Sequence, residues 1–284
     1  MSVARSSEPP APPPVPAFDP APYPWLADDT CRGPQPVESL ERRFPAPPGF
    51  RRPPLPERSF GAWLRTLPLA APGTPVRTYR GDVLLPADHP NIAAVAALDI
   101  GTGDLQQCAD SVIRLHGEWQ WWLGRRDMAY RAAAGVPIPF ARWAQGDRLQ
   151  PKGASLEWRV KAASARSDHA TFRKYMDAVF MFANTGSVAK QAGEAKVEQL
   201  APGDFVVQAG NPGHAVLVLD VALADDGRKV ALLGQGYMPA QSFQVLRPTG
   251  GSPWFPIDAA SEAITTPFWR PFRWSLLRRW GEPG

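Results

Sequence analysis

Segment 200–219, LAPGDFVVQAGNPGHAVLVL, contains two short apolar runs, each preceded by turn-forming residues. A Pro-Gly-Asp sequence stands before the first run, and a Pro-Gly pair stands before His214 and the second run. Proline and glycine favour turns, whereas apolar and β-branched runs of this length favour strands. We therefore predict strands at 204–207 and 214–219, which pair antiparallel because the connection between them is short.

The same type of pattern continues downstream, and helical periodicity precedes it. Segments 229–233 and 242–246 are two further apolar runs between turns, which predicts an antiparallel sheet. Upstream, apolar residues recur at spacings of three and four in 104–123 and 168–182, which predicts two helices, and Asp104 is the expected N-cap of the first. Helices followed by strands without alternation predict an α+β fold.

Proline is concentrated at the N-terminus. Seventeen of the 34 prolines lie in the first 60 residues. That composition is typical of a linker, so we expect residues 1–57 to form a Pro-rich disordered arm and residues 58–284 to form a single α+β domain. No window is long and apolar enough for a transmembrane helix, and no secretory signal is visible at the start of the chain.

Charge and cysteine content exclude several function classes. The 31 basic and 27 acidic residues alternate along the chain, so we expect no nucleic-acid partner, and the basic run near 270–279 is expected to be a solvated helix end. Two cysteines exclude a disulfide framework. The four histidines lack metal-ligand spacing and no phosphate-binding motif occurs, so we predict no metal and no cofactor.

Cys108 is the candidate nucleophile, because it lies near the start of the helix predicted at 104–123. Exposed amides and the positive end of the helix dipole lower a thiol pKa, and the thiolate is the nucleophilic form. Gln106 and Gln107 offer side-chain amides that could stabilise an oxyanion. The alternative is structural, since Cys108 also falls on the apolar stripe of the helix, where a cysteine serves as a small hydrophobe.

The turn, strand and histidine pattern of 200–219 resembles the second half of papain-like cysteine peptidases and amidases of the NlpC type. The resemblance implies a core helix carrying Cys108, followed by an antiparallel sheet carrying the base His214, with Gln235 on the next strand as the residue that orients the imidazole. Asp220 competes for that role, but it lies six residues along the strand from His214, about 20 Å away.

A longer resemblance connects the chain with the bacterial family known as domain of unknown function 4846. It covers roughly residues 59 to 280 and rests on six ordered motifs: 59–65 (SFGAWLR), 104–110 (DLQQCAD), 172–175 (FRKY), 203–205 (GDF), 212–216 (PGHAV) and 236–241 (GYMPAQ). Members are often exported or lipid-anchored, which implies a location in the cell envelope or periplasm if the given start is not the native one. The missing signal leaves the cytoplasm as the alternative.

Together these features predict a thiol hydrolase, a peptidase or amidase that acts on an amide bond in a peptide or peptidoglycan-like substrate. The alternative from a different class is a non-catalytic envelope domain that binds a glycan or a protein through Trp-rich loops. Trp121, Trp143, Trp158 and Trp254 are the candidates for such loops, because the helical stripes do not force them inward. The sequence leaves the oligomeric state open.

Overall fold

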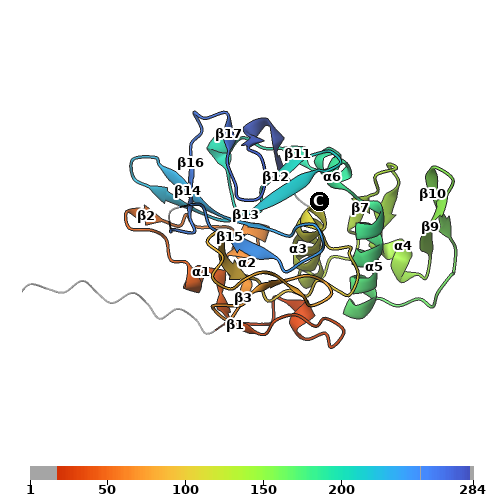
Figure 1. Ribbon diagram of the computed structural model, residues 1–284. Helices are drawn as coiled ribbons and strands as arrows, with labels where there is room; N and C mark the ends of the chain where they lie inside the picture. Colours follow the sequence, from red (N-terminus) through yellow and green to blue (C-terminus); the bar gives the residue numbers. More distant parts are fainter. Residues whose placement is uncertain (1–17, 250, 282–284) are drawn as a thin grey trace, which may run out of the picture.

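The computed structural model describes residues 18–249 and 251–281 of the chain. Its central feature is a large antiparallel sheet (Figure 1). Seven of its strands follow one another in the order β11 (Gly193–Glu194), β19 (Leu277–Arg279), β12 (Phe205–Gln208), β13 (His214–Ala224), β14 (Lys229–Gln235), β15 (Gln244–Leu246) and β6 (Ile92–Val95). Two more strands pair at its margin, β2 (Phe50–Arg51) with β13 and β16 (Phe255–Ile257) with β14.

Ten further strands form two-stranded sheets, each antiparallel. The pairs are β1 (Pro36–Ser39) with β3 (Pro68–Ala70), β4 (Val76–Arg77) with β5 (Val83–Leu85), β7 (Ala129–Arg131) with β8 (Pro137–Pro139), β9 (Arg148–Lys152) with β10 (Ser155–Arg159), and β17 (Ala263–Ile264) with β18 (Phe272–Arg273). The described residues contain six α-helices: α1 (Leu40–Arg43), α2 (Phe60–Arg65), α3 (Cys108–Trp122), α4 (Phe140–Ala144), α5 (His169–Phe182) and α6 (Thr185–Gln191).

The four predicted strands of the sheet are confirmed as β12, β13, β14 and β15, and the two long predicted helices are confirmed as α3 and α5. The prediction of an α+β, papain-like arrangement of helices followed by a sheet is wrong. The described chain is mostly β, strands occur before, between and after the helices, and the large sheet takes in β6 from ahead of α3. Most of the additional strands are only two to four residues long, too short for their hydrophobic periodicity to be recognised.

Helix α3 lies against one face of the sheet and contacts β13 (Figure 1). The alternation of side chains along β13 explains this arrangement. Ala215, Leu217 and Leu219 belong to the larger hydrophobic core, which includes the apolar side of α3, whereas Val216 and Val218 belong to a second core on the opposite face. Both faces of the strand are therefore buried, which accounts for its continuous apolar sequence.

The N-terminal segment departs from the expected disordered arm. From residue 18 on it packs against the body of the protein: Tyr23 and Trp25 are 1% and 2% exposed. The indole Nε1 of Trp25 donates to the carbonyl oxygen of Ala97 at 2.7 Å, and the Trp25 ring lies 5.8 Å from that of Trp63. The expectation is therefore wrong for residues 18–57, because aromatic anchors between the prolines bury enough surface to order the segment. Its first 17 residues lie outside the described ones.

Buried carboxylates of the fold are paired with arginines. Asp220, fully buried on β13, accepts hydrogen bonds from Arg52 at 2.5 Å and Arg65 at 3.0 Å. Arg114, fully buried on α3, bonds Asp99 at 2.6 Å and Glu118 at 2.8 Å. A buried charge is tolerated only when it is paired and hydrogen-bonded, so these groups are parts of the core. The carboxylate of Asp220 is therefore occupied by ion pairs with the N-terminal segment and α2.

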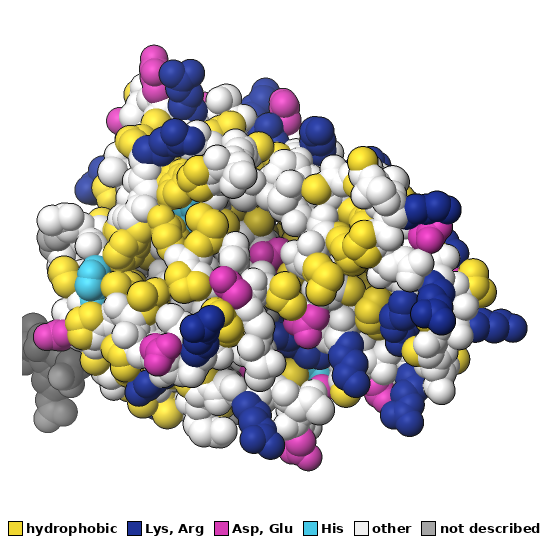
Figure 2. All heavy atoms as spheres, turned by 45° about the vertical axis from the view of Figure 1, so that its right-hand side comes forward, with side chains coloured by type: hydrophobic (Ala, Val, Ile, Leu, Met, Phe, Trp, Pro, Cys, Tyr) yellow, Lys and Arg dark blue, Asp and Glu magenta, His cyan; other side chains and the backbone are white. Residues whose placement is uncertain are grey.

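The surface carries both signs of charge. On the face in Figure 2, Lys and Arg side chains are denser toward the right, with Asp and Glu side chains and apolar side chains among them. None of the described helices combines the length and apolar character needed to cross a bilayer.

Candidate functional site

His214 and Gln235 meet across the sheet. His214 begins β13 and Gln235 ends β14, and the register that pairs Leu217 with Gly234 brings the two polar residues to the same end of the sheet. Imidazole Nε2 lies 2.7 Å from the Gln235 amide oxygen Oε1. Since an amide oxygen only accepts, Nε2 carries the proton and Nδ1 is left with its lone pair.

The Nδ1 atom of His214 is buried and has no hydrogen-bond partner among the described residues. Burial lowers the pKa of His214 to about 4, although the hydrogen bond to Gln235 opposes this shift. The ring is enclosed by Tyr237, Trp269 and Phe272, with ring centroids 4.8, 4.9 and 6.0 Å from its own. His214 is therefore a neutral, oriented imidazole with one free acceptor nitrogen.

Cys108 is the first residue of α3. The N-cap is Gln107, three residues after the predicted N-cap Asp104. The backbone N–H of Gln107 donates to Asp110 Oδ2 at 3.1 Å, which fixes the start of the helix at this position. The Cys108 side chain reaches the start of β13, where Sγ lies 3.9 Å from the carbonyl oxygen of Gly213. The nucleophile candidate thus contacts the residue that precedes His214.

The ends of β14 and α3 are pressed together at a glycine. A Cβ at Gly236 would overlap Ser111 Oγ and lie 2.8 Å from the carbonyl oxygen of Gln107. Only a residue without a side chain permits this approach, so Gly236 holds the end of β14 against the first turn of α3. This contact brings Gln235 close to the helix start that carries Cys108.

The thiol of Cys108 has a raised pKa, contrary to the expectation from its position at a helix start. Burial raises the pKa to about 11, and the negative charge of Asp110 acts in the same direction. Backbone amides of Ala215 and Ala109 lower it, but burial outweighs them because the side chain is only 4% exposed. At neutral pH the resting state is therefore a protonated thiol near a neutral imidazole.

Asp110 adds a second buried titratable group beside the thiol. It is 8% exposed, and burial raises its pKa to about 8, although backbone hydrogen bonds favour the ionised form. A carboxyl with a pKa near neutrality, two residues from a candidate nucleophile, is typical of functional sites.

Among the described residues no hydrogen bond joins Cys108 to His214 Nδ1, because Nδ1 is without a partner. The loop 210–213 contributes to two cavities. Cys108, Gln107 and Asp110 line a cavity of about 340 Å³ with the loop, and Tyr237, Phe268 and Trp269 line an open cleft of about 780 Å³ with residues 210–212. The cavity beside the thiol and the aromatic cleft beside His214 therefore share part of their lining.

The two predicted oxyanion donors differ in their surroundings. Gln106 is fully buried; its Nε2 donates to the Asp99 carbonyl oxygen at 3.2 Å and its Oε1 accepts from Arg114 at 2.9 Å. It therefore belongs to the buried charge cluster and cannot reach a ligand. Gln107 is half-buried at the rim of the cavity, where its Nε2 donates to Asp104 at 3.1 Å and keeps a second N–H.

Most tryptophans proposed for ligand-binding loops are parts of the core. Trp121, Trp143 and Trp254 are 9%, 8% and 5% exposed, whereas Trp158 is half-buried beneath Arg142. Trp269 lines the open aromatic cleft, although its sequence context did not mark it as a candidate. Its position follows from the return of the C-terminal segment to the start of β13, and no local sequence signal predicts that.

A comparison with protein families decides the relationship of the chain. The model of the family described as "Domain of unknown function (4846)" matches residues 40–279. The chain belongs to this family. No curated protein and no solved structure matches the chain.

Proposed function

We propose that Cys108, His214 and Gln235 form a thiol-dependent acyl-transfer site that hydrolyses an amide bond. The observation that carries the proposal is the 2.7 Å hydrogen bond from His214 Nε2 to Gln235, which leaves Nδ1 as a buried acceptor without a partner. A buried polar atom without a partner is costly and calls for an explanation. A proton-accepting role toward a thiol supplies one.

The chemistry starts from neutral groups. His214 Nδ1 takes the thiol proton while Sγ of Cys108 attacks the carbonyl carbon, and the oxyanion is stabilised by Gln107 and by amides at the start of α3. The proton then passes to the leaving amine and a thioester remains. Water hydrolyses the thioester, which releases the acid and restores the thiol. Sγ and Nδ1 must approach each other for this transfer, and catalytic hydrogen bonds of this kind tighten when substrate binds.

Peptidoglycan peptide is the proposed substrate class, which would place the activity in the cell envelope. In this proposal the cavity of about 340 Å³ beside Cys108 receives a peptide stem, and the aromatic cleft offers ring faces for a sugar. Both cavities share the loop, so one branched substrate could contact both.

The decisive experiment compares the wild type with Cys108→Ala on a digested peptidoglycan library, read by mass spectrometry. We expect product masses that increase by one water per cleaved bond with the wild type and none with the variant. Gln235→Leu should slow the reaction, whereas Gln150→Leu, at a half-buried glutamine on β9, should not. Cleavage by Cys108→Ala at the wild-type rate would overturn the proposal.

The second candidate function is binding without catalysis in the aromatic cleft. Phe268 is 37% exposed and has a positive φ of 69°, a conformation that is strained for a bulky residue and that often marks functional sites. Its carbonyl oxygen accepts from the Tyr237 hydroxyl at 2.9 Å, so the two residues that line the cleft with Trp269 are joined to each other. Under this function Trp269→Ala abolishes binding of peptidoglycan fragments in calorimetry, while Cys108→Ala leaves it unchanged and no cleavage occurs.

A further inference from the structure

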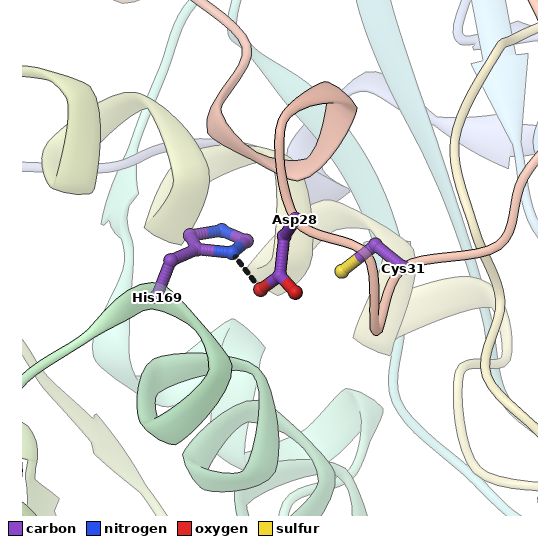
Figure 3. A group of neighbouring side chains, drawn as sticks. All are labelled: Asp28, Cys31 and His169. Carbon is purple, nitrogen blue, oxygen red and sulfur yellow. Dashed lines mark hydrogen bonds and ion pairs between the residues drawn. The ribbon is translucent and has the colours of Figure 1, made fainter.

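Three side chains with metal-ligating atoms converge away from Cys108 and His214. Asp28 and Cys31 belong to the N-terminal segment, and His169 is the first residue of α5. One ligand atom from each lies within 4.8 Å of the other two. Figure 3 shows the carboxylate of Asp28 between the imidazole and the thiol, with all three side chains pointing toward one another.

The turn that carries two of these residues orients their ligand atoms. The backbone N–H of Cys31 donates to the Asp28 carbonyl oxygen at 2.8 Å, which closes a turn of four residues. Thr30 donates to Asp28 Oδ1 through its backbone N–H at 2.9 Å and its hydroxyl at 2.6 Å. Because Oδ1 is occupied in this way, Oδ2 is the atom directed at His169 Nδ1, 2.6 Å away.

A second carboxylate sets the tautomer of the imidazole. His169 Nε2 lies 2.9 Å from Oε2 of Glu118, which is fully buried and is itself held by Arg114 Nε at 2.8 Å. Trp121 packs edge-on against the imidazole with ring centroids 5.6 Å apart, which restricts its rotation. A carboxylate that accepts from one ring nitrogen of a histidine, and so presents the other as a lone pair, is the usual outer partner of a metal-bound histidine.

We propose that Asp28, Cys31 and His169 bind a divalent transition-metal ion, for which Zn²⁺ is the best match. Nitrogen, thiolate sulfur and carboxylate oxygen together are the donor set of zinc, whereas Mg²⁺ and Ca²⁺ prefer oxygen alone. Zinc takes four ligands, so three protein ligands leave a fourth position for water or another ligand. Solvent can reach that position, because the side chains of His169 and Asp28 are 12% and 9% exposed. Glu118 acts as a positioning residue through His169.

Binding has a defined proton balance. The metal replaces the proton between Asp28 Oδ2 and His169 Nδ1, and it replaces the thiol proton of Cys31, so both protons are released to solvent. The competing account is a metal-free ion pair that only attaches the N-terminal segment to α5. That account requires Asp28 and His169 and leaves Cys31 only as a side chain packed against the core, although its thiol is aimed at the same point.

The test is Co²⁺ titration of the intact chain, followed by competition with Zn²⁺. We expect one Co²⁺ per chain and a near-ultraviolet thiolate-to-cobalt charge-transfer band, both displaced by Zn²⁺. Cys31→Ser should remove the band and weaken binding at least roughly 100-fold. Cys108→Ser is the matched control, since it removes the other cysteine, and it should keep both the band and the affinity.

A second variant tests the site without removing any of the three metal ligands. Glu118→Gln keeps the three ligands and should weaken Co²⁺ binding about 10- to 100-fold while the charge-transfer band persists at saturation. Circular dichroism of each variant verifies that it is folded. No stoichiometric Co²⁺ binding by the wild type, or a band that survives in Cys31→Ser, would overturn the proposal and leave the metal-free ion pair.

Discussion

Asp110→Asn is the substitution whose effect on stability follows most directly from the structure. Asp110 is 8% exposed, and burial raises its pKa from 3.8 to about 8. The carboxyl is therefore protonated in the folded protein and ionised in the unfolded chain at pH 7. Because one pKa unit corresponds to about 1.4 kcal/mol, taking up this proton on folding at pH 7 costs about 4 kcal/mol.

The pH dependence has a definite sign. Since the folded-state pKa is raised, the stability associated with the protonated carboxyl is complete below pH 3.8 and is lost as the pH rises toward about 8. Asparagine carries no charge in this range and keeps a carbonyl oxygen that can accept from the Gln107 N–H. We therefore expect the variant to be more stable than the wild type by about 4 kcal/mol at pH 7 and equally stable near pH 4.

Urea unfolding followed by tryptophan fluorescence, at several pH values between these limits, measures the difference. Asp88→Asn, at an exposed aspartate, is the matched control for removal of one carboxylate. A stability difference that stays constant with pH, or a variant that is less stable than the wild type at pH 7, would refute the reasoning. In either case Asp110 would not carry a buried proton in the folded protein.

Three further expectations follow from the same geometry. The hydrolytic rate on peptidoglycan peptide should rise with pH through about 4, where His214 becomes neutral. Gln235→Leu should lower this rate roughly 100-fold. A rise in rate centred near the usual histidine pKa would contradict the buried imidazole. Trp25→Ala should lower the free energy of unfolding by about 3 to 5 kcal/mol in chemical denaturation, because a fully packed indole and its hydrogen bond are lost. Trp158→Ala should lower it far less. A decrease for Trp25→Ala as small as that for Trp158→Ala would show that the N-terminal segment does not pack on the core. Asp220→Asn should cost about 3 kcal/mol in the same assay, because two arginines lose their buried counter-charge, and an unchanged midpoint would argue against that network.

Local patterns in the sequence were sufficient for the elements with long, regular periodicity. The strands that became β12 to β15 and the helices that became α3 and α5 follow from apolar spacing and turn residues. The order of these elements also placed His214 and Gln235 on neighbouring strands, where the structure joins them by a hydrogen bond. The register that makes this contact was not predicted, because an irregularity between Val218 and Asp220 shifts the pairing of β13 with β14.

The pKa of Cys108 depends on tertiary structure. A position at the start of a helix predicts a lowered pKa, but burial at the start of β13 outweighs the helix amides and raises it. The role of Gln106 depends on packing in the same way, because a neighbouring arginine and a carbonyl oxygen occupy its amide. Burial and long-range partners of this kind have no local sequence signal.

By itself, the sequence determined the large antiparallel strands, the two long helices and the order in which Cys108, His214 and Gln235 appear. Only the tertiary structure decided what the Pro-rich N-terminal segment does. Tyr23 and Trp25 dock it on the core, and this docking carries Cys31 and Asp28 to His169, more than a hundred residues away in the chain. Local composition predicts disorder for such a segment, because the surface that it buries belongs to residues far along the sequence.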